Sequence, residues 1–398
     1  MRKAIIHVWS SKIPMYAFVA ILNSVLSLLM ATLISGLFDR DTFIEFYATL
    51  SASLLGVTLA QFGLGNVMLS FRGEIAGNQG PLIATWSLFV TPIFVLLYLF
   101  ILSAYFNMSG TVNIDTRAVG FYVLGRACWL SFQSSELILR SFRVVIAGLM
   151  IQVFLSFALV WIMYKYGTSV KFYFIGIGVV SVLLQILFNR SLPDIHVLKT
   201  KYLVLASKGV LNSVLITFYS IGDKIFANTL LIENKQNLSD YFNASIVIGY
   251  FYFIVNVFSS WWGSVVSKDW LIQREKWRDR KYFARNMLWI LLIVPMLLVL
   301  LIYKSLFEIW DDTLYLLTGL LLAINLVVQA MIKYTQGIIL MEKDMVTLVV
   351  SSVIGVLSFI ILVSFFHWPP SLLLSSALCI SSIVTFCFHT YSIKSYDF

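Results

Sequence analysis

Charged residues are scarce in this chain: Asp, Glu, Lys and Arg make up 12% of its 398 residues. An ordinary soluble domain has about 25%. Hydrophobic residues reach 60%, and the mean hydropathy is +0.90. A globular fold cannot bury that much apolar surface. The composition therefore excludes an ordinary soluble protein and indicates a chain that lies largely in a lipid bilayer.

Cysteine and histidine are also rare, and neither occurs in a functional spacing. There is no CxxC pair, no zinc-ligand pattern and no Ser-His-Asp arrangement. We therefore expect no catalytic residue, no metal site, no disulfide and no cofactor. The residues concerned are Cys128, Cys379, Cys387, His7, His196, His367 and His389.

Apolar runs recur along the whole chain, each long enough to cross a hydrocarbon core about 30 Å thick as a helix. They lack the period of two that barrel strands need. The fold predicted is an all-α polytopic membrane protein with twelve transmembrane helices. The expected spans are 13–38, 44–69, 82–106, 118–139, 143–166, 168–188, 203–232, 241–266, 286–304, 313–332, 345–366 and 371–391.

The basic residues are divided unequally between the two sides of the membrane. With these spans, 20 Lys and Arg lie on the N-terminal side, 6 on the other side and 2 inside spans, which accounts for all 28. The positive-inside rule then places both termini in the cytoplasm. The net charge of +9 follows from this topology, and we expect no nucleic-acid partner. The densest basic cluster, Lys268–Arg285, is either an orientation signal or a helix resting on anionic headgroups.

The two halves of the chain resemble each other. The sequence LNSVL occurs at 22–26 in the first span and again at 211–215 in the seventh. An aromatic pair opens the next span each time. Six spans repeated in the same orientation form a parallel repeat about an axis normal to the membrane. We therefore expect two six-helix bundles related by a pseudo-two-fold axis, with domains at 1–200 and 201–398.

The fourth span carries a polar stripe. Its members follow one another at spacings of 3, 4, 3 and 4, which places them on one helical face. A charge at mid-bilayer costs about 2.5 to 3.5 kcal/mol on insertion scales. We therefore expect the stripe to face a hydrated interior. Its members are Arg126, Trp129, Gln133, Glu136 and Arg140.

Two further spans carry similar stripes, so three helices could line a mainly cationic passage. The alternative for the uncharged members is hydrogen bonding between helices. The adjacent Asp223 and Lys224 point about 100° apart on a helix, so they need not neutralise each other. Glu136 or Asp223 could carry a coupling proton. The stripe of the seventh span is Ser213, Thr217, Ser220, Lys224 and Asn228, and the stripe of the tenth is Asn325, Gln329, Lys333 and Gln336. Asn212 is a further substrate-binding candidate.

Two segments resemble a known transporter superfamily. They are FYATLSASLLGVTLAQFGLG at 46–65, and the seventh span with the LSDYFNASIVIGYFYFIVNVFSSWWGSVVS that follows it. They resemble the polysaccharide-exporter branch of the multidrug/oligosaccharidyl-lipid/polysaccharide (MOP) superfamily, and within it the Wzx-type O-antigen flippases.

That resemblance implies alternating access through a cavity between two bundles. It also implies a substrate, an undecaprenyl-pyrophosphate-linked oligosaccharide that crosses the bacterial inner membrane for surface polysaccharide and lipopolysaccharide synthesis. A polymerase and a chain-length regulator are the implied partners, besides membrane lipids. The diphosphate would meet Arg126, Arg140, Lys224 and Lys333, and the glycan would meet the amides and aromatics.

Three other functions compete with this interpretation. A drug or metabolite antiporter of the same superfamily would use a more acidic cavity. A polysaccharide polymerase or ligase would carry a long periplasmic loop, whereas every extramembrane segment expected here is about 20 residues or shorter by our boundaries. A membrane scaffold would have no need for buried charges.

Overall fold

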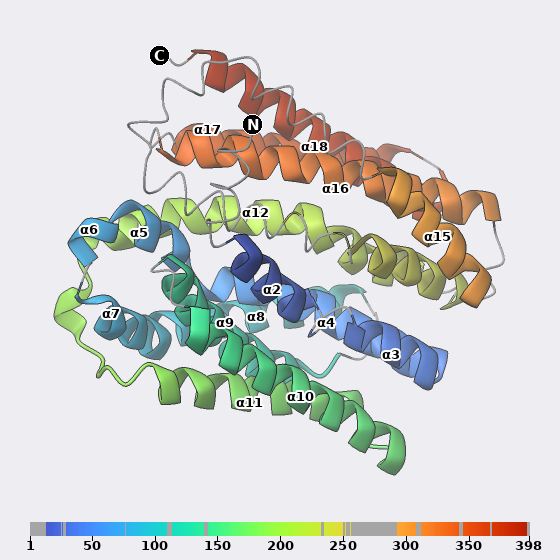
Figure 1. The fold of residues 1–398 in the computed structure, drawn as a ribbon. Coiled ribbons are helices and arrows are strands. Elements are labelled where there is room, and N and C mark those ends of the chain that lie inside the picture. Colours follow the sequence, from blue (N-terminus) through green and yellow to red (C-terminus); the bar gives the residue numbers. More distant parts are fainter. Residues whose placement is uncertain are drawn as a thin grey trace, which may run out of the picture.

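The computed structural model describes residues 13–24, 26, 29–75, 77–109, 114–138, 142–231, 235–249, 251, 255, 293–307, 312–341, 345–366 and 368–395. Within them the regular elements are all helices (Figure 1). This confirms the predicted all-α class. The basic cluster Lys268–Arg285 and Arg140 lie outside the described residues.

The first half of the chain forms a bundle in which α9 is central, because it packs against α4, α8, α10 and α11. Its elements are α2 (Ile13–Ser24), α3 (Met30–Leu37), α4 (Arg40–Ala60), α5 (Leu64–Ser70), α6 (Arg72–Ile75), α7 (Gln79–Thr85), a π-helical turn (Trp86–Val90), α8 (Thr91–Ser109), α9 (Thr116–Ile138), α10 (Phe142–Tyr166), α11 (Val170–Phe188) and a 3₁₀ turn (Ile195–Val197).

The second half forms another bundle, in which α18 packs against α12, α16 and α17. Its elements are α12 (Thr200–Leu230), a helix over 235–249, α15 (Ile293–Phe307), α16 (Asp312–Met341), α17 (Met345–Phe365) and α18 (Pro370–Ser395). The long α12 also contacts α4, so it lies between the two groups of helices (Figure 1). The boundary at 200/201 stays a prediction.

Small residues let α9 and α11 approach closely. A Cβ on Gly125 would collide with the backbone of Gly178, and a Cβ on Gly178 would collide with the backbone of Phe121. Helices in lipid associate through such van der Waals contact, because the lipid tails are as apolar as the side chains. This contact holds the polar face of α9 in a fixed place inside the first bundle.

The second predicted span, 44–69, is not one helix. The helix α4 ends at Ala60, and α5 begins after a turn in which Phe62 has φ 42° and Gly63 has φ 63°. At Gly63 a Cβ would also meet the backbone carbonyl of Ala206 on α12. Only glycine meets both conditions without strain, so the turn brings the first bundle against α12.

The third predicted span, 82–106, contains a π-helical turn at Trp86–Val90 between α7 and α8. Pro92 is the second residue of α8, and a proline removes one backbone donor from the helical ladder. The helix nevertheless continues, and Gln79–Tyr105 is one of seven described helices long and apolar enough to cross a membrane. The helices α9 and α12 are long enough but are not among these seven, and they carry the buried Arg126, Asp223 and Lys224.

Candidate functional site

Arg126 lies in the middle of α9 and is only 4% exposed. Its guanidinium donates to Oε1 of Gln152 on α10 and, at 3.5 Å, to Oδ1 of Asn23 on α2. The side chains of Tyr122 and Tyr173 also interact with it. Two of these partners are amides and two are phenols, which are uncharged when protonated. Arg126 is absent from the ion pairs of the described residues, so its positive charge is solvated by dipoles rather than neutralised.

A chain of polar groups continues from Arg126 across the first bundle. Nε2 of Gln152 donates to Oγ of Ser181 on α11 at 3.0 Å. The hydroxyl of Tyr173 lies 3.4 Å from Oγ of Ser156 and 3.3 Å from the carbonyl oxygen of Leu26. Four helices, α2, α9, α10 and α11, therefore hold the guanidinium in place.

Two other members of the predicted stripe on α9 have unsatisfied polar atoms. Trp129 has no exposed surface and Gln133 is 5% exposed. Nε1 of Trp129 and Oε1 of Gln133 have no hydrogen-bond partner within the described part of the chain. The Trp129 ring packs on Phe132 and Phe188. Buried donors and acceptors without partners are costly, so this face of α9 suits water or a ligand with polar groups.

In the second bundle, Asp223 and Lys224 neutralise each other. Nζ of Lys224 lies 3.1 Å from Oδ1 and 3.3 Å from Oδ2 of Asp223, whose side chain has no exposed surface. The expectation that the two neighbours need not pair is therefore wrong. The long, flexible lysine stem lets the ammonium reach back across the 100° that separates the two Cα positions. Tyr241 completes the group by donating to Oδ2 of Asp223 at 2.6 Å.

The remaining predicted residues lie on several helices of both bundles. Glu136 and Lys333 are half-buried on α9 and α16. Asn212 belongs to α12. Asn325, from the stripe on α16, accepts a hydrogen bond of 2.6 Å from Ser382 on α18, as expected of a contact between helices.

The two bundles contact each other at the end of the molecule where Asp41 lies, which we call the Asp41 end. There Nζ of Lys235 forms an exposed ion pair with Asp41, with both oxygens 2.8 Å away. One layer deeper, Oγ of Ser35 donates to Oδ1 of Asn243 at 3.1 Å. Both contacts join segments about 200 residues apart in the sequence, so they hold the first bundle to the second.

An aromatic cluster lies beside these polar contacts. The ring of Phe242 packs on Tyr47, with centroids 4.7 Å apart, and on Phe43 at 6.4 Å. All three side chains are at most 3% exposed. Aromatic pairs at such distances stabilise a contact beyond the area that they bury. The Asp41 end is therefore closed by a buried apolar layer beneath a polar surface.

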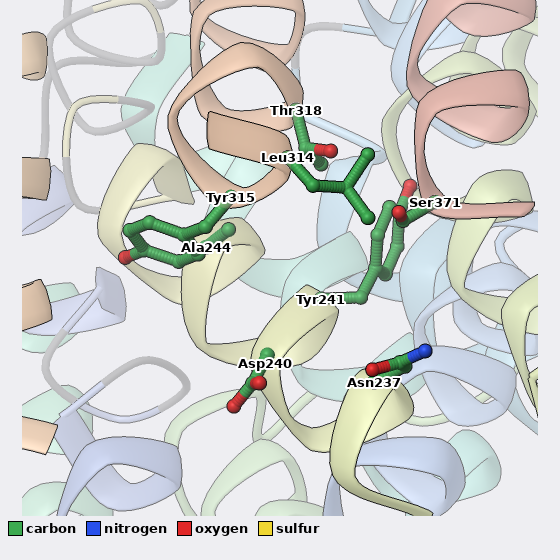
Figure 2. A pocket seen from close by; sticks show the side chains of 8 residues that line it. All are labelled: Asn237, Asp240, Tyr241, Ala244, Leu314, Tyr315, Thr318 and Ser371. Carbon is green, nitrogen blue, oxygen red and sulfur yellow. The ribbon is translucent and has the colours of Figure 1, made fainter. Parts of the chain in front are cut away.

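A small pocket of about 30 Å³ lies within the second bundle near the same end. The helix over 235–249 supplies one wall, and the starts of α16 and α18 supply the others. Figure 2 shows the Tyr241 ring rising from its helix toward Leu314 and Ser371. The buried hydroxyl of Thr318 has no hydrogen-bond partner among the described residues. The pocket therefore offers both a ring face and an unsatisfied hydroxyl.

No protein-family model matches the chain, and no curated protein matches its sequence. Solved structures do match over its whole length. The eukaryotic MATE transporter AtDTX14 aligns with a TM-score of 0.68 at 13% identity, covering 97% of this chain and 95% of that one. The chain has the fold of the MATE transporters.

Two further structures support this. A MATE transporter in complex with MaD3S aligns with a TM-score of 0.63 at 16% identity, covering 96% of both chains. A variant of the Vibrio cholerae MATE transporter VcmN gives 0.62 at 11% identity, covering 96% and 95%. All three of these structures are of MATE transporters. The predicted arrangement of two helical bundles is confirmed by this MATE-like fold.

Sequence reasoning missed the partners of the buried charges. Gln152 and Ser156 stand one turn apart in an otherwise apolar segment, a signal that could have placed them on an inward face. Tyr241 is an aromatic residue at the start of a predicted span and carries no such signal. Its role follows only from the packing of its helix against α12.

Proposed function

We propose that this protein is an alternating-access transporter of the MATE type, which exports a small molecule in exchange for an ion. The observation that carries the proposal is the similarity to MATE transporters over 96–97% of the chain, together with buried ionisable groups in each bundle. One of the solved neighbours is a multidrug resistance MATE transporter of the MOP superfamily, with a TM-score of 0.57 at 14% identity.

A second candidate is the flippase for an undecaprenyl-pyrophosphate-linked oligosaccharide. It is favoured by Arg126, a buried cation whose described partners are all uncharged when the tyrosines are protonated. A cation solvated only by dipoles attracts an anion such as a diphosphate. The unsatisfied Nε1 of Trp129 and Oε1 of Gln133 on the same face suit the hydroxyls of a sugar.

We place the chain in the bacterial inner membrane with both termini in the cytoplasm, according to its basic residues. The Asp41 end then faces outward and is closed. Release would require the contacts of Asp41, Phe43 and Ser35 with the second bundle to separate. Entry from the cytoplasm would require the contacts at the opposite end, such as the Glu74–Lys201 ion pair, to separate.

The experiment that separates the two candidates uses a deletion strain complemented with the wild type, Arg126→Met or Arg117→Met. Arg117 is exposed on the same helix and serves as the matched control. Each strain is assayed for efflux of ethidium and for accumulation of lipid-linked glycan, with protein amounts checked by immunoblot.

An antiporter predicts that the wild type restores ethidium efflux and leaves the glycan profile unchanged. A flippase predicts that the deletion strain accumulates lipid-linked repeat units, that the wild type and Arg117→Met clear them, and that Arg126→Met does not. If the wild type changes neither readout, both candidates are wrong.

A further inference from the structure

His389 is buried, with no exposed surface, at a point where three helices of the second bundle meet. It belongs to α18. Its Nδ1 lies 3.0 Å from Oγ1 of Thr335 on α16, and its Nε2 lies 2.8 Å from Oγ of Ser351 on α17. Thr335 and Ser351 are at most 1% exposed. Both ring nitrogens are thus engaged by hydroxyls, one from each neighbouring helix.

The two hydroxyls already have backbone acceptors. Oγ1 of Thr335 donates within α16 to the carbonyls of Met331 and Ile332, at 3.2 and 3.0 Å. Oγ of Ser351 donates to the carbonyl of Leu348 at 3.0 Å. A hydroxyl carries one hydrogen and a neutral imidazole carries one N–H. Each hydroxyl therefore either donates to its own helix and accepts from the ring, or leaves its helix to donate to the ring.

Counting hydrogens distinguishes the two charge states of the ring. The network contains four contacts: each hydroxyl with its backbone, and each hydroxyl with the ring. A neutral His389 supplies one N–H and the hydroxyls supply two hydrogens, so one contact stays without a hydrogen. A protonated His389 supplies two N–H groups, and all four contacts are then satisfied.

We propose that His389 is the proton-binding site of the second bundle, with Thr335 and Ser351 as the acceptors that hold the bound proton. Release of the proton obliges one hydroxyl to turn from its own helix toward the ring, which couples the charge state to the packing of α16, α17 and α18. The claim that this proton is the ion exchanged for substrate rests on the proposed function. The claim that His389 binds a proton does not depend on it.

The charged surroundings of the ring are sparse. On α17 there is no ionisable side chain between Met345 and Phe365. The ionisable residues of α16, α12 and the rest of α18 are Asp312, Tyr315, Lys333 and Tyr334, then Lys201, Tyr202, Lys208, Tyr219, Asp223 and Lys224, and Cys379, Cys387, Tyr391 and Lys394. Lys333 lies two residues before Thr335, about 200° around α16, and so faces elsewhere. No carboxylate is among the partners that the structure gives the ring.

The position of the site suits exchange of protons with water. His389 lies six residues before the end of α18, which is about 9 Å along the helix axis. Thr335 and Ser351 lie equally close to the end of α16 and the start of α17. The pocket beside Tyr315 is about 30 Å away along α16, at the closed Asp41 end. The proton site is therefore at the opposite end of the second bundle.

Burial without a carboxylate partner disfavours the charged form of the ring, so the titration must extend to acidic pH. The test is an NMR titration of the full chain with ¹⁵N-labelled histidine in lipid nanodiscs, from about pH 3.5 to 8. The chain has four histidines, and His389→Gln identifies the resonances of His389. The expected result is a ring that binds a proton within this range and shows both N–H groups shielded from exchange. Ser351→Ala removes one acceptor and should weaken proton binding about tenfold. A ring that keeps one neutral tautomer over the whole range overturns the proposal.

The coupling role has a separate readout. Glutamine keeps a donor and an acceptor at position 389 but cannot bind a proton. We expect His389→Gln to remove the pH dependence of whichever transport the complementation assay detects. Transport that keeps the wild-type pH dependence in this variant overturns the coupling role. If the ring titrates but the wild type transports neither ethidium nor lipid-linked glycan, the proton site stands and the proposed function fails.

Discussion

The hydroxyl of Tyr241 donates a 2.6 Å hydrogen bond to Oδ2 of Asp223, a carboxylate without exposed surface. The ammonium of Lys224 contacts both oxygens of the same carboxylate. Because a buried charge is tolerated only when it is paired and hydrogen-bonded, Tyr241 links the helix over 235–249 to α12.

Replacing Tyr241 by phenylalanine should therefore destabilise the protein by about 1.5–3 kcal/mol, the usual contribution of a hydrogen bond to a charged group. Thermal unfolding in lipid nanodiscs measures the loss. Tyr391→Phe is the control, since Tyr391 is 77% exposed. Equal stability of the two variants would show that Lys224 alone satisfies Asp223.

The turn after α4 predicts a cost for any side chain at Gly63. Its φ of 63° and its approach to the carbonyl of Ala206 both disfavour a Cβ. We expect Gly63→Ala to lower the free energy of unfolding by about 2 kcal/mol. At Gly36, in α3, a Cβ meets nothing within 4 Å, so Gly36→Ala should leave stability unchanged or raise it slightly. A neutral Gly63→Ala would mean that the turn relaxes.

Cysteines in place of Asp41 and Lys235 should be joined by a short bifunctional maleimide, because their side chains form an ion pair between the bundles. The background is Cys387→Ser, which removes an exposed thiol and leaves the buried Cys128 and Cys379. The crosslink should block transport, since it prevents the Asp41 end from opening. Cysteines at 41 and 201 are the control. Position 201 lies at the far end of α12, so this pair should not crosslink. Failure of the 41/235 pair to crosslink would contradict a closed Asp41 end.

Glu74 and Lys201 form an exposed ion pair between α6 and α12, and the hydrogen bond from Lys201 lowers the pKa of Glu74. A lowered carboxyl pKa adds stability above the pKa of the unfolded chain, and this stability is lost as the pH falls through the pKa of the folded state. Glu74→Gln should thus be slightly less stable than the wild type at pH 7, and the difference should shrink toward pH 4. Salt at about 1 M should reduce it as well, because the pair is exposed. A stability difference that changes with neither pH nor salt would show that the ion pair contributes nothing to stability.

The helical class, the approximate positions of the spans and the polar face of α9 could all be predicted, because each depends on local hydropathy or on the helical period. Arg126, Trp129 and Gln133 lie at buried positions of one helix, as their spacing requires. The break at Gly63 could not be predicted in this way, since it depends on how closely the turn approaches α12. The MATE-like fold confirms the predicted architecture of two helical bundles, whereas transport and the lipid-linked glycan substrate stay proposals.

By itself, the sequence determined that this chain is an all-helical membrane protein with ionisable residues inside its helices, because apolar runs and residue spacing are properties of a single helix. Only the tertiary structure decided which groups those residues meet. It pairs Asp223 with its own neighbour and with Tyr241, gives Arg126 amide partners, and places His389 between two hydroxyls. The helical period shows which face a side chain occupies, but the partner on that face depends on which helix packs there and at what height.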